Sequence, residues 1–288
     1  MNFDNIESLE DCIKIYQCNK KYLFKCDLES EEYWIKKKKY LDNLNCWFVC
    51  EKYINEVLFS KKIDFINIFK TFKEKLPINK NTIKLTCRIN NLEIVKMLVN
   101  TFKDKLPIDA GALSMACEIN NLEIVKELVD VFKDKLPIND IAIYLACRIN
   151  NLEIVKILIK TFRDKLPVHY NGHAIEWACY NNNLEIVKEL VDVFKDKLPI
   201  NDNAIYLACK NNNFEIVKIL TNTFKKKLPI DDNAIYWACR NGNLEIVKIL
   251  TKTFKKKLPI DDEAIYWSRK NDEILELVKN IKRKENNY

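Results

Sequence analysis

Glycine and proline are both scarce in this sequence of 288 residues, which contains three glycines and seven prolines. At average usage, a chain of this length would carry about 20 glycines and about 14 prolines. All-β folds with many glycine-dependent turns are therefore disfavoured, and so are glycine-rich nucleotide-binding loops. Because 48% of the residues are hydrophobic and 31% are charged, the chain is too apolar to be disordered and is expected to fold.

The sequence also lacks a long hydrophobic segment and a strong excess of one charge. Its apolar runs, such as residues 142–147, are far shorter than the roughly 20 residues that span a membrane. The opening residues, MNFDNIESLED, are acidic where a secretory signal would be basic and then apolar. The formal net charge of +7 is mild and does not indicate a nucleic-acid-binding protein. We expect a soluble, cytoplasmic monomer without membrane or nucleic-acid partners.

The seven prolines are regularly spaced and reveal an internal repeat. Each follows a leucine and precedes isoleucine or valine, and successive prolines are 30 or, once, 32 residues apart. A fixed period of this length is typical of stacked repeat arrays, in which each unit is one supersecondary element. The prolines are Pro77, Pro107, Pro137, Pro167, Pro199, Pro229 and Pro259.

The third unit illustrates the secondary structure that each repeat is expected to form. A short helix over residues 142–147 has its apolar residues on one face, and Asn150 interrupts it. A second helix begins at Leu152 and continues to about Lys165, where Pro167 ends it because proline disfavours helical geometry at the preceding residue. Each repeat is therefore predicted to be a helix–turn–helix with an extended return.

One position in the turn between the two helices carries asparagine in five repeats and glycine in the sixth. Asparagine and glycine tolerate a positive φ angle better than other residues. The turn is therefore predicted to need a left-handed residue at Asn90, Asn120, Asn150, Asn182, Asn212 and Gly242.

The repeats resemble the helix-pair signature of ankyrin repeats, most clearly at Ala238-Cys-Arg-Asn-Gly-Asn-Leu-Glu-Ile-Val-Lys-Ile-Leu250. The pattern recurs in six units, but its period is shorter than 33 residues, and segments such as Asn203-Ala-Ile-Tyr206 replace the Thr-Pro-Leu-His tetrapeptide. This shorter form is similar to arrays encoded by large DNA viruses of amoebae. The resemblance implies an all-α solenoid that is not an enzyme and binds a protein partner through its concave face.

The ends of the chain follow the repeat pattern imperfectly, as terminal units that face water are expected to do. We divide the sequence into a helical N-terminal segment at 1–50, a degenerate unit at 51–77, six full repeats at 78–259 and a C-terminal cap at 260–288.

The N-terminal segment offers a second resemblance, to the later part of an F-box. It is carried by Asp11-Cys-Ile-Lys-Ile-Tyr-Gln-Cys-Asn-Lys-Lys-Tyr22, then Cys26 and Tyr33-Trp34. The opening Leu-Pro helix of that family is absent. The resemblance implies an adaptor that joins a substrate to a Skp1–cullin ubiquitin ligase. The alternative is a helical cap over the first repeat, which the exposed end of a solenoid requires.

The cysteines and histidines do not form an evident metal or catalytic site. Six cysteines share one repeat position and are expected to be free and buried, because stacked helices lie about 8–10 Å apart and a disulfide needs Cα atoms within about 7 Å. His169 and His173 straddle Gly172 in the inserted turn, and Glu176 is the one carboxylate nearby, whereas a metal site needs three or four convergent ligands. We predict no catalytic residue, metal or cofactor. The six cysteines are Cys87, Cys117, Cys147, Cys179, Cys209 and Cys239.

Three tryptophans share one first-helix position that holds leucine or methionine in the other repeats. The resemblance implies that this position faces the concave groove, and aromatic anchors with arginines are favoured at protein interfaces. The alternative, that the position packs one repeat on the next, stays open. The predicted binding row is Leu85, Met115, Leu145, Trp177, Leu207, Trp237 and Trp267, flanked by Arg148, Tyr180, Lys210 and Arg240.

Overall fold

The structure is a computed structural model that describes Ile66, Phe69 and residues 78–166 and 173–285. Within these ranges every regular element is an α-helix or a 3₁₀ helix and no strand is present. The predicted all-α fold class is therefore confirmed. The expected N-terminal segment at 1–50, with its F-box resemblance, lies outside the described residues.

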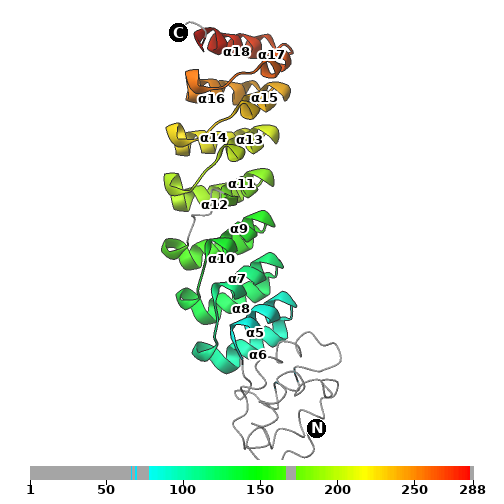
Figure 1. The fold of residues 1–288 in the computed structure, drawn as a ribbon, viewed down its shortest axis with the longest axis vertical. Coiled ribbons are helices and arrows are strands. Elements are labelled where there is room, and N and C mark those ends of the chain that lie inside the picture. Colours follow the sequence, from blue (N-terminus) through cyan, green and yellow to red (C-terminus); the bar gives the residue numbers. More distant parts are fainter. Residues whose placement is uncertain (1–65, 67–68, 70–77, 167–172, 286–288) are drawn as a thin grey trace, which may run out of the picture. The chain divides into compact units, whose positions relative to one another are not determined.

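The chain divides into two compact units, Met1–Pro137 and Ile138–Tyr288, which are described separately. In the first unit, two described helix pairs pack on each other: the first helices α5 and α7 are in contact, and so are the second helices α6 and α8 (Figure 1). The bounds are α5 Lys80–Arg88, α6 Leu92–Phe102, α7 Ala110–Glu118 and α8 Leu122–Phe132, with 3₁₀ turns at Lys103–Lys105 and Lys133–Lys135.

The second unit contains five consecutive helix pairs in the described ranges. Each first helix contacts the first helix of the next pair, and the second helices form a parallel series of contacts beside them (Figure 1). The first helices are α9 Asp140–Arg148, α11 His173–Tyr180, α13 Asp202–Lys210, α15 Asp232–Arg240 and α17 Asp262–Ser268. The second helices are α10 Leu152–Phe162, α12 Leu184–Phe194, α14 Phe214–Phe224, α16 Leu244–Phe254 and α18 Asp272–Glu285.

The turn inside each pair follows from two consecutive residues. In the third repeat, Asn150 has a φ of 62° and its N–H donates to the carbonyl of Cys147 across 3.1 Å. Asn151 then caps α10, because its Oδ1 accepts from the N–H of Ile154 at 3.0 Å. The predicted positive φ is confirmed in all six repeats, at 61°, 60°, 62°, 55°, 56° and 66° from Asn90 to Gly242.

The predicted C-terminal end of the second helix is wrong by one turn. In the third repeat α10 ends at Phe162, and Arg163–Lys165 form a 3₁₀ turn instead of continuing the helix to Lys165. In the other repeats the residue after the last phenylalanine leaves helical geometry altogether, with φ and ψ of 47° and −120° at Lys225 and 50° and −122° at Lys255. The proline four residues later therefore follows a turn that has already ended the helix.

The core lies between the first and second helices of each pair and between neighbouring pairs. In the third repeat, Ala146 and Cys147 of α9 and Ile154, Val155 and Leu158 of α10 are fully buried. The same positions recur in the other repeats, so each helix pair covers the apolar face of its neighbour within the unit. This packing leaves one edge of the first helices and one face of the second helices exposed.

Candidate protein-binding site

The seven predicted row residues lie on the first helices, but they are not equally accessible. Leu145 and Leu207 are only 5% and 8% exposed, so at these two positions the side chain serves packing. The three tryptophans are half-buried, with part of each indole at the surface. In the first unit, Leu85 of α5 and Met115 of α7 are also half-buried.

The indole of Trp237 lies between cations from two consecutive helices. The guanidinium carbon of Arg240, on the same helix α15, lies 4.6 Å from the ring centroid, and the Lys210 Nζ of α13 lies 5.4 Å from it. Tyr236 meets the indole edge to face at 5.4 Å. Cations over an indole face are attracted by the ring quadrupole, so these contacts fix where the charges lie.

The indole of Trp267, on the next first helix α17, also lies between two cations. Arg240 lies 5.4 Å from its centroid and the Lys270 Nζ lies 4.3 Å from it. Arg240 therefore contacts both indoles, and charge and ring alternate along the surface. We call the five residues Lys210, Trp237, Arg240, Trp267 and Lys270 the cation–indole row.

Tyrosines four residues before the cations support the row, and the sequence reasoning missed them. Arg240 Nη1 donates to the Tyr236 hydroxyl across 2.9 Å, and Lys210 Nζ donates to the Tyr206 hydroxyl across 3.3 Å. Arg148 also lies over the Tyr144 ring, at 5.5 Å. The sequence could have indicated these contacts, because residues four apart on a helix are neighbours on its surface.

The helix α11 interrupts this pattern, since Glu176 stands where the other first helices of the second unit carry tyrosine. Its carboxylate accepts from Asn201 Nδ2 at 2.9 Å and from Asn203 Nδ2 at 3.2 Å, and it pairs with His173 Nδ1 at 3.0 Å. At the position of the cations, Tyr180 is 58% exposed and meets Trp177 edge to face at 5.1 Å. At α11 the exposed edge is therefore aromatic, and the Glu176 carboxylate is already bound by neighbouring side chains.

The histidines do not form a metal site in the described part of the chain. His173 begins α11 and contacts Glu176, whereas His169 lies outside the described residues. No group of three or more histidine, cysteine, aspartate or glutamate side chains is arranged to hold a metal ion within the described ranges.

The six repeated cysteines are free and buried, as the sequence predicted. Burial raises the pKa of the Cys87 and Cys239 thiols to about 12, because the thiolate loses its solvation inside the array. Burial likewise raises the pKa of Cys117, Cys179 and Cys209. A thiol held in its neutral form is a poor nucleophile, so these residues act as small core side chains.

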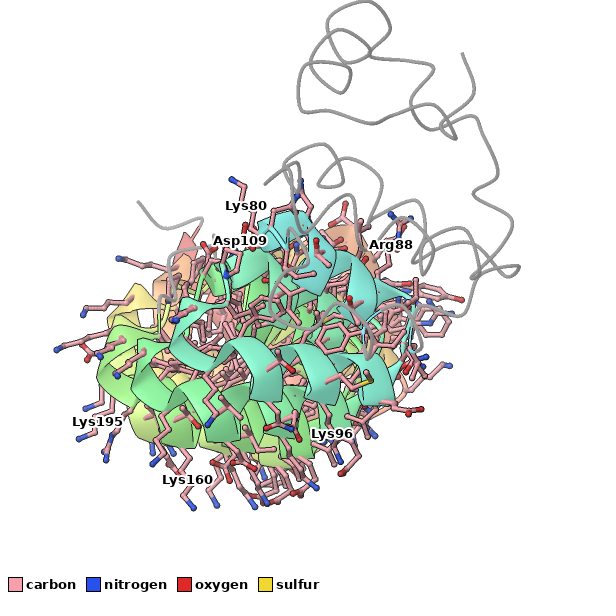
Figure 2. The ribbon with its side chains drawn as sticks, turned by 90° about the horizontal axis from the view of Figure 1, so that it is seen from below. Lys80, Arg88, Lys96, Asp109, Lys160 and Lys195 are labelled. Atoms are coloured by element: carbon pink, nitrogen blue, oxygen red, sulfur yellow. The ribbon has the colours of Figure 1, made fainter. Side chains whose placement is uncertain are left out.

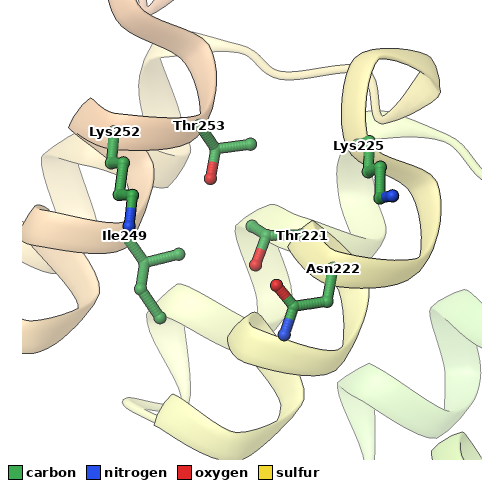
Figure 3. Close-up of a pocket in the computed structure, with 6 residues that line it drawn as sticks. All are labelled: Thr221, Asn222, Lys225, Ile249, Lys252 and Thr253. Carbon is green, nitrogen blue, oxygen red and sulfur yellow. The ribbon is translucent and has the colours of Figure 1, made fainter.

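A pocket of about 310 Å³ lies away from the row, between the C-terminal ends of α14 and α16 (Figure 3). The hydroxyl of Thr221 is bound within its own helix, since it donates to the carbonyl of Val217 at 2.9 Å. The lining contains no carboxylate, thiol or imidazole that could act as an acid, base or nucleophile. The lining residues are Thr221, Asn222, Lys225, Ile249, Lys252 and Thr253.

Comparison with known families identifies the class of protein that this geometry defines. The model for ankyrin repeats (3 copies) matches residues 83–167, 113–202 and 175–262, which together span more than half of the chain. The chain belongs to the ankyrin-repeat family, whose arrays are generally protein–protein interaction modules. No curated protein matches the chain. No helix in the described ranges has the length and apolarity needed to cross a membrane.

Proposed function

We propose that this chain is a non-enzymatic interaction module that binds a partner protein through the exposed edge of its first helices. The observation that carries the proposal is the cation–indole row, in which two half-buried tryptophans alternate with three exposed cations. Tryptophan and arginine are the side chains most enriched among residues that dominate binding energy at protein interfaces.

Several lysines on the second helices are paired with carboxylates, unlike the cations of the row. Lys188 pairs with Glu185 at 2.8 Å, Lys248 pairs with Glu273 at 2.9 Å, and Lys126 pairs with Glu123 on α8 at 3.0 Å. The hydrogen bond from Lys188 holds the pKa of Glu185 below its usual value. In the first unit, Arg88 at the end of α5 and Lys96 on α6 both point away from the ribbon (Figure 2). Charge pairing on the second helices supports their assignment as a solvated surface.

The test uses substitutions that the array already tolerates at equivalent positions. Leucine occupies the tryptophan position at Leu207, so Trp237→Leu and Trp267→Leu remove the indoles without introducing a foreign residue. We expect the double variant to fold and to lose the partners that the wild-type chain recovers from its native cell. Phe214→Leu is the matched control, because it replaces an aromatic residue on a second helix where other repeats carry leucine. Equal recovery by the double variant and the control would contradict the proposal.

A second candidate function is that of a substrate adaptor for a Skp1–cullin ubiquitin ligase. It is supported by the resemblance of residues 11–34 to part of an F-box. In this case the N-terminal segment would bind Skp1 while the array binds the substrate. Purified Skp1 should then be retained by the chain at micromolar concentration, and Trp34→Ala should reduce retention. A chain that retains no Skp1 leaves only the first function.

A further inference from the structure

We infer that the cation–indole row binds an acidic protein segment in an extended, polyproline-like conformation, with a carboxylate at every third residue. The inference rests on the proposed function and names the chemistry of the partner. Three features support it: the charge of the row, the contacts that hold its cations in place, and the spacing between those cations.

The row presents three positive charges that no described carboxylate neutralises. Lys210, Arg240 and Lys270 are exposed, and their contacts in the described part of the chain are with tyrosine and tryptophan side chains. The acidic residues on the helices of Lys210 and Arg240 lie in the first turn, where Asp202 begins α13 and Asp232 begins α15. Lys270 lies in the turn after α17, two residues before Asp272, and forms no ion pair with it. A helix of this length separates its ends by about 12 Å, which exceeds the Debye length of about 8–10 Å at physiological salt. An anionic partner would complement this edge.

The cations are held in place before a partner arrives. Each indole of the row contacts two cations, and the Tyr206 and Tyr236 hydroxyls accept a further hydrogen bond from Lys210 and Arg240. Ordering a long side chain on binding costs about 0.5–1.5 kcal/mol, and contacts already present in the free protein reduce that cost. Guanidinium and ammonium groups held in this way keep donors that can reach a carboxylate.

The spacing of the row fits one backbone conformation of the partner. Consecutive packed helices lie about 8–10 Å apart. Lys210 and Arg240 end α13 and α15, and Lys270 lies in the turn directly after α17. A polyproline II segment has three residues per turn and rises about 3.1 Å per residue, so equivalent side chains recur about every 9 Å on one face. Carboxylates at every third residue would therefore meet Lys210, Arg240 and Lys270 in turn.

Single-stranded nucleic acid fits the row less well, although it is also an extended anion. Proteins that bind single strands stack bases on open aromatic faces. In the row the indole faces of Trp237 and Trp267 are already occupied by cations at 4.3–5.4 Å. A base would have to displace the cation that binds the phosphate.

The experiment measures binding of two labelled peptides to the full chain by fluorescence anisotropy. The first peptide repeats Glu-Pro-Ala three times, and the second has the same composition with its three glutamates adjacent. The double variant Lys210→Gln/Arg240→Gln, called the row variant, removes two of the three positive charges of the row. The matched control Lys218→Gln/Lys252→Gln removes two exposed lysines of the second helices, one of which also lies over an aromatic ring, that of Phe214, at 5.7 Å. A third probe is a labelled oligothymidine.

We expect the spaced peptide to bind with a Kd below about 1 mM. It should bind the wild-type chain and the control alike, and bind the row variant about tenfold more weakly, as the loss of two exposed charge pairs implies. The peptide with adjacent glutamates should bind more weakly than the spaced one. The inference is overturned if the spaced peptide does not bind at about 1 mM, or if the row variant binds it as well as the control does. It is also overturned if the two peptides bind equally, or if oligothymidine binds the row more tightly than the spaced peptide does. If the peptide fails while Trp237→Leu/Trp267→Leu still prevents partner recovery, the partner chemistry is wrong and the proposed function stands.

Discussion

The side-chain amide of Asn243 donates a hydrogen bond to Oδ1 of Asn212 across 2.7 Å and joins residues 31 positions apart in the sequence. Asn212 is the positive-φ residue of its turn and Asn243 is the cap of the next second helix. Asn213 contacts Asn182 and Asn183 contacts Asn150 in the same way, both at 2.7 Å. The turn asparagine therefore has two functions, since it permits the left-handed backbone and accepts a bond from the next repeat.

The two functions of the turn asparagine are separable by substitution at Asn212. Asn212→Gly keeps the positive φ accessible and removes the acceptor, so it should lower the free energy of unfolding by about 1 kcal/mol. Asn212→Val removes the acceptor and also forces a β-branched residue into the left-handed region, which adds about 1–2 kcal/mol. Urea unfolding followed by circular dichroism measures both. Equal losses for the two variants would contradict the assignment.

Gly242 offers the reverse test. Its φ is 66°, and a Cβ added there would have no neighbour within 4 Å. Asparagine adopts this backbone in the other repeats and restricts the unfolded chain more than glycine does, but any side chain at this φ is strained. The two effects oppose each other, so Gly242→Asn should change the free energy of unfolding by less than about 1 kcal/mol. Gly242→Val should lower it, because valine does not tolerate the left-handed backbone. A drop in the thermal midpoint of the Gly242→Asn variant as large as that of the Gly242→Val variant would argue against this interpretation of the turn.

The lysine that follows the second helix in five of the described repeats is predicted to be strained, because its φ is positive. Lys255 has φ and ψ of 50° and −122°, a region that glycine occupies readily and other residues rarely. Backbone strain of this kind costs about 1–3 kcal/mol. Lys255→Gly should therefore raise the thermal midpoint. Lys252→Gly in the interior of α16 serves as the control and should lower it by the helix propensity of glycine, about 1 kcal/mol. A lower midpoint for both variants would exclude strain at Lys255.

The buried cysteines should make stability depend on alkaline pH. Because burial raises the pKa of Cys87 and Cys239 from 9.0 to about 12, the folded chain retains protons that the unfolded chain releases above pH 9. The stability that these thiols contribute is complete below pH 9 and is lost as the pH rises toward 12. The urea midpoint should thus fall more steeply between pH 8.5 and pH 10.5 in the wild-type chain than in a Cys87→Ala/Cys239→Ala variant. Parallel pH profiles would contradict the assignment, and so would rapid modification of the native thiols.

Much of the fold was predictable from the sequence because its determinants are local. Asn150 and Asn151 specify the turn and the helix cap with two consecutive residues. The recurrence of cysteine at the position of Cys147 in every repeat indicated that this position is buried. The early end of α10 at Phe162 was not predictable, since the nearest helix-terminating residue in the sequence is Pro167, four residues beyond Arg163.

The candidate site was predictable only in part. The tryptophan position was visible as a departure from leucine. The tyrosines that bind Lys210 and Arg240 lie four residues before them, a spacing that the sequence also shows. The alternation of charge and ring was not visible. It depends on Arg240 of α15 reaching Trp267 of α17, a contact that only the stacking register of the helices determines.

The most direct measurement of the central claim is the labelling of lysine amines by an acylating reagent, with and without a partner recovered from the native cell. Lys210 and Lys270 lie in the cation–indole row, whereas Lys218 and Lys252 are exposed on second helices. The account predicts that the bound partner protects Lys210 and Lys270 and leaves the labelling of Lys218 and Lys252 unchanged. Protection of the second-helix lysines with full labelling of Lys210 and Lys270 would contradict it.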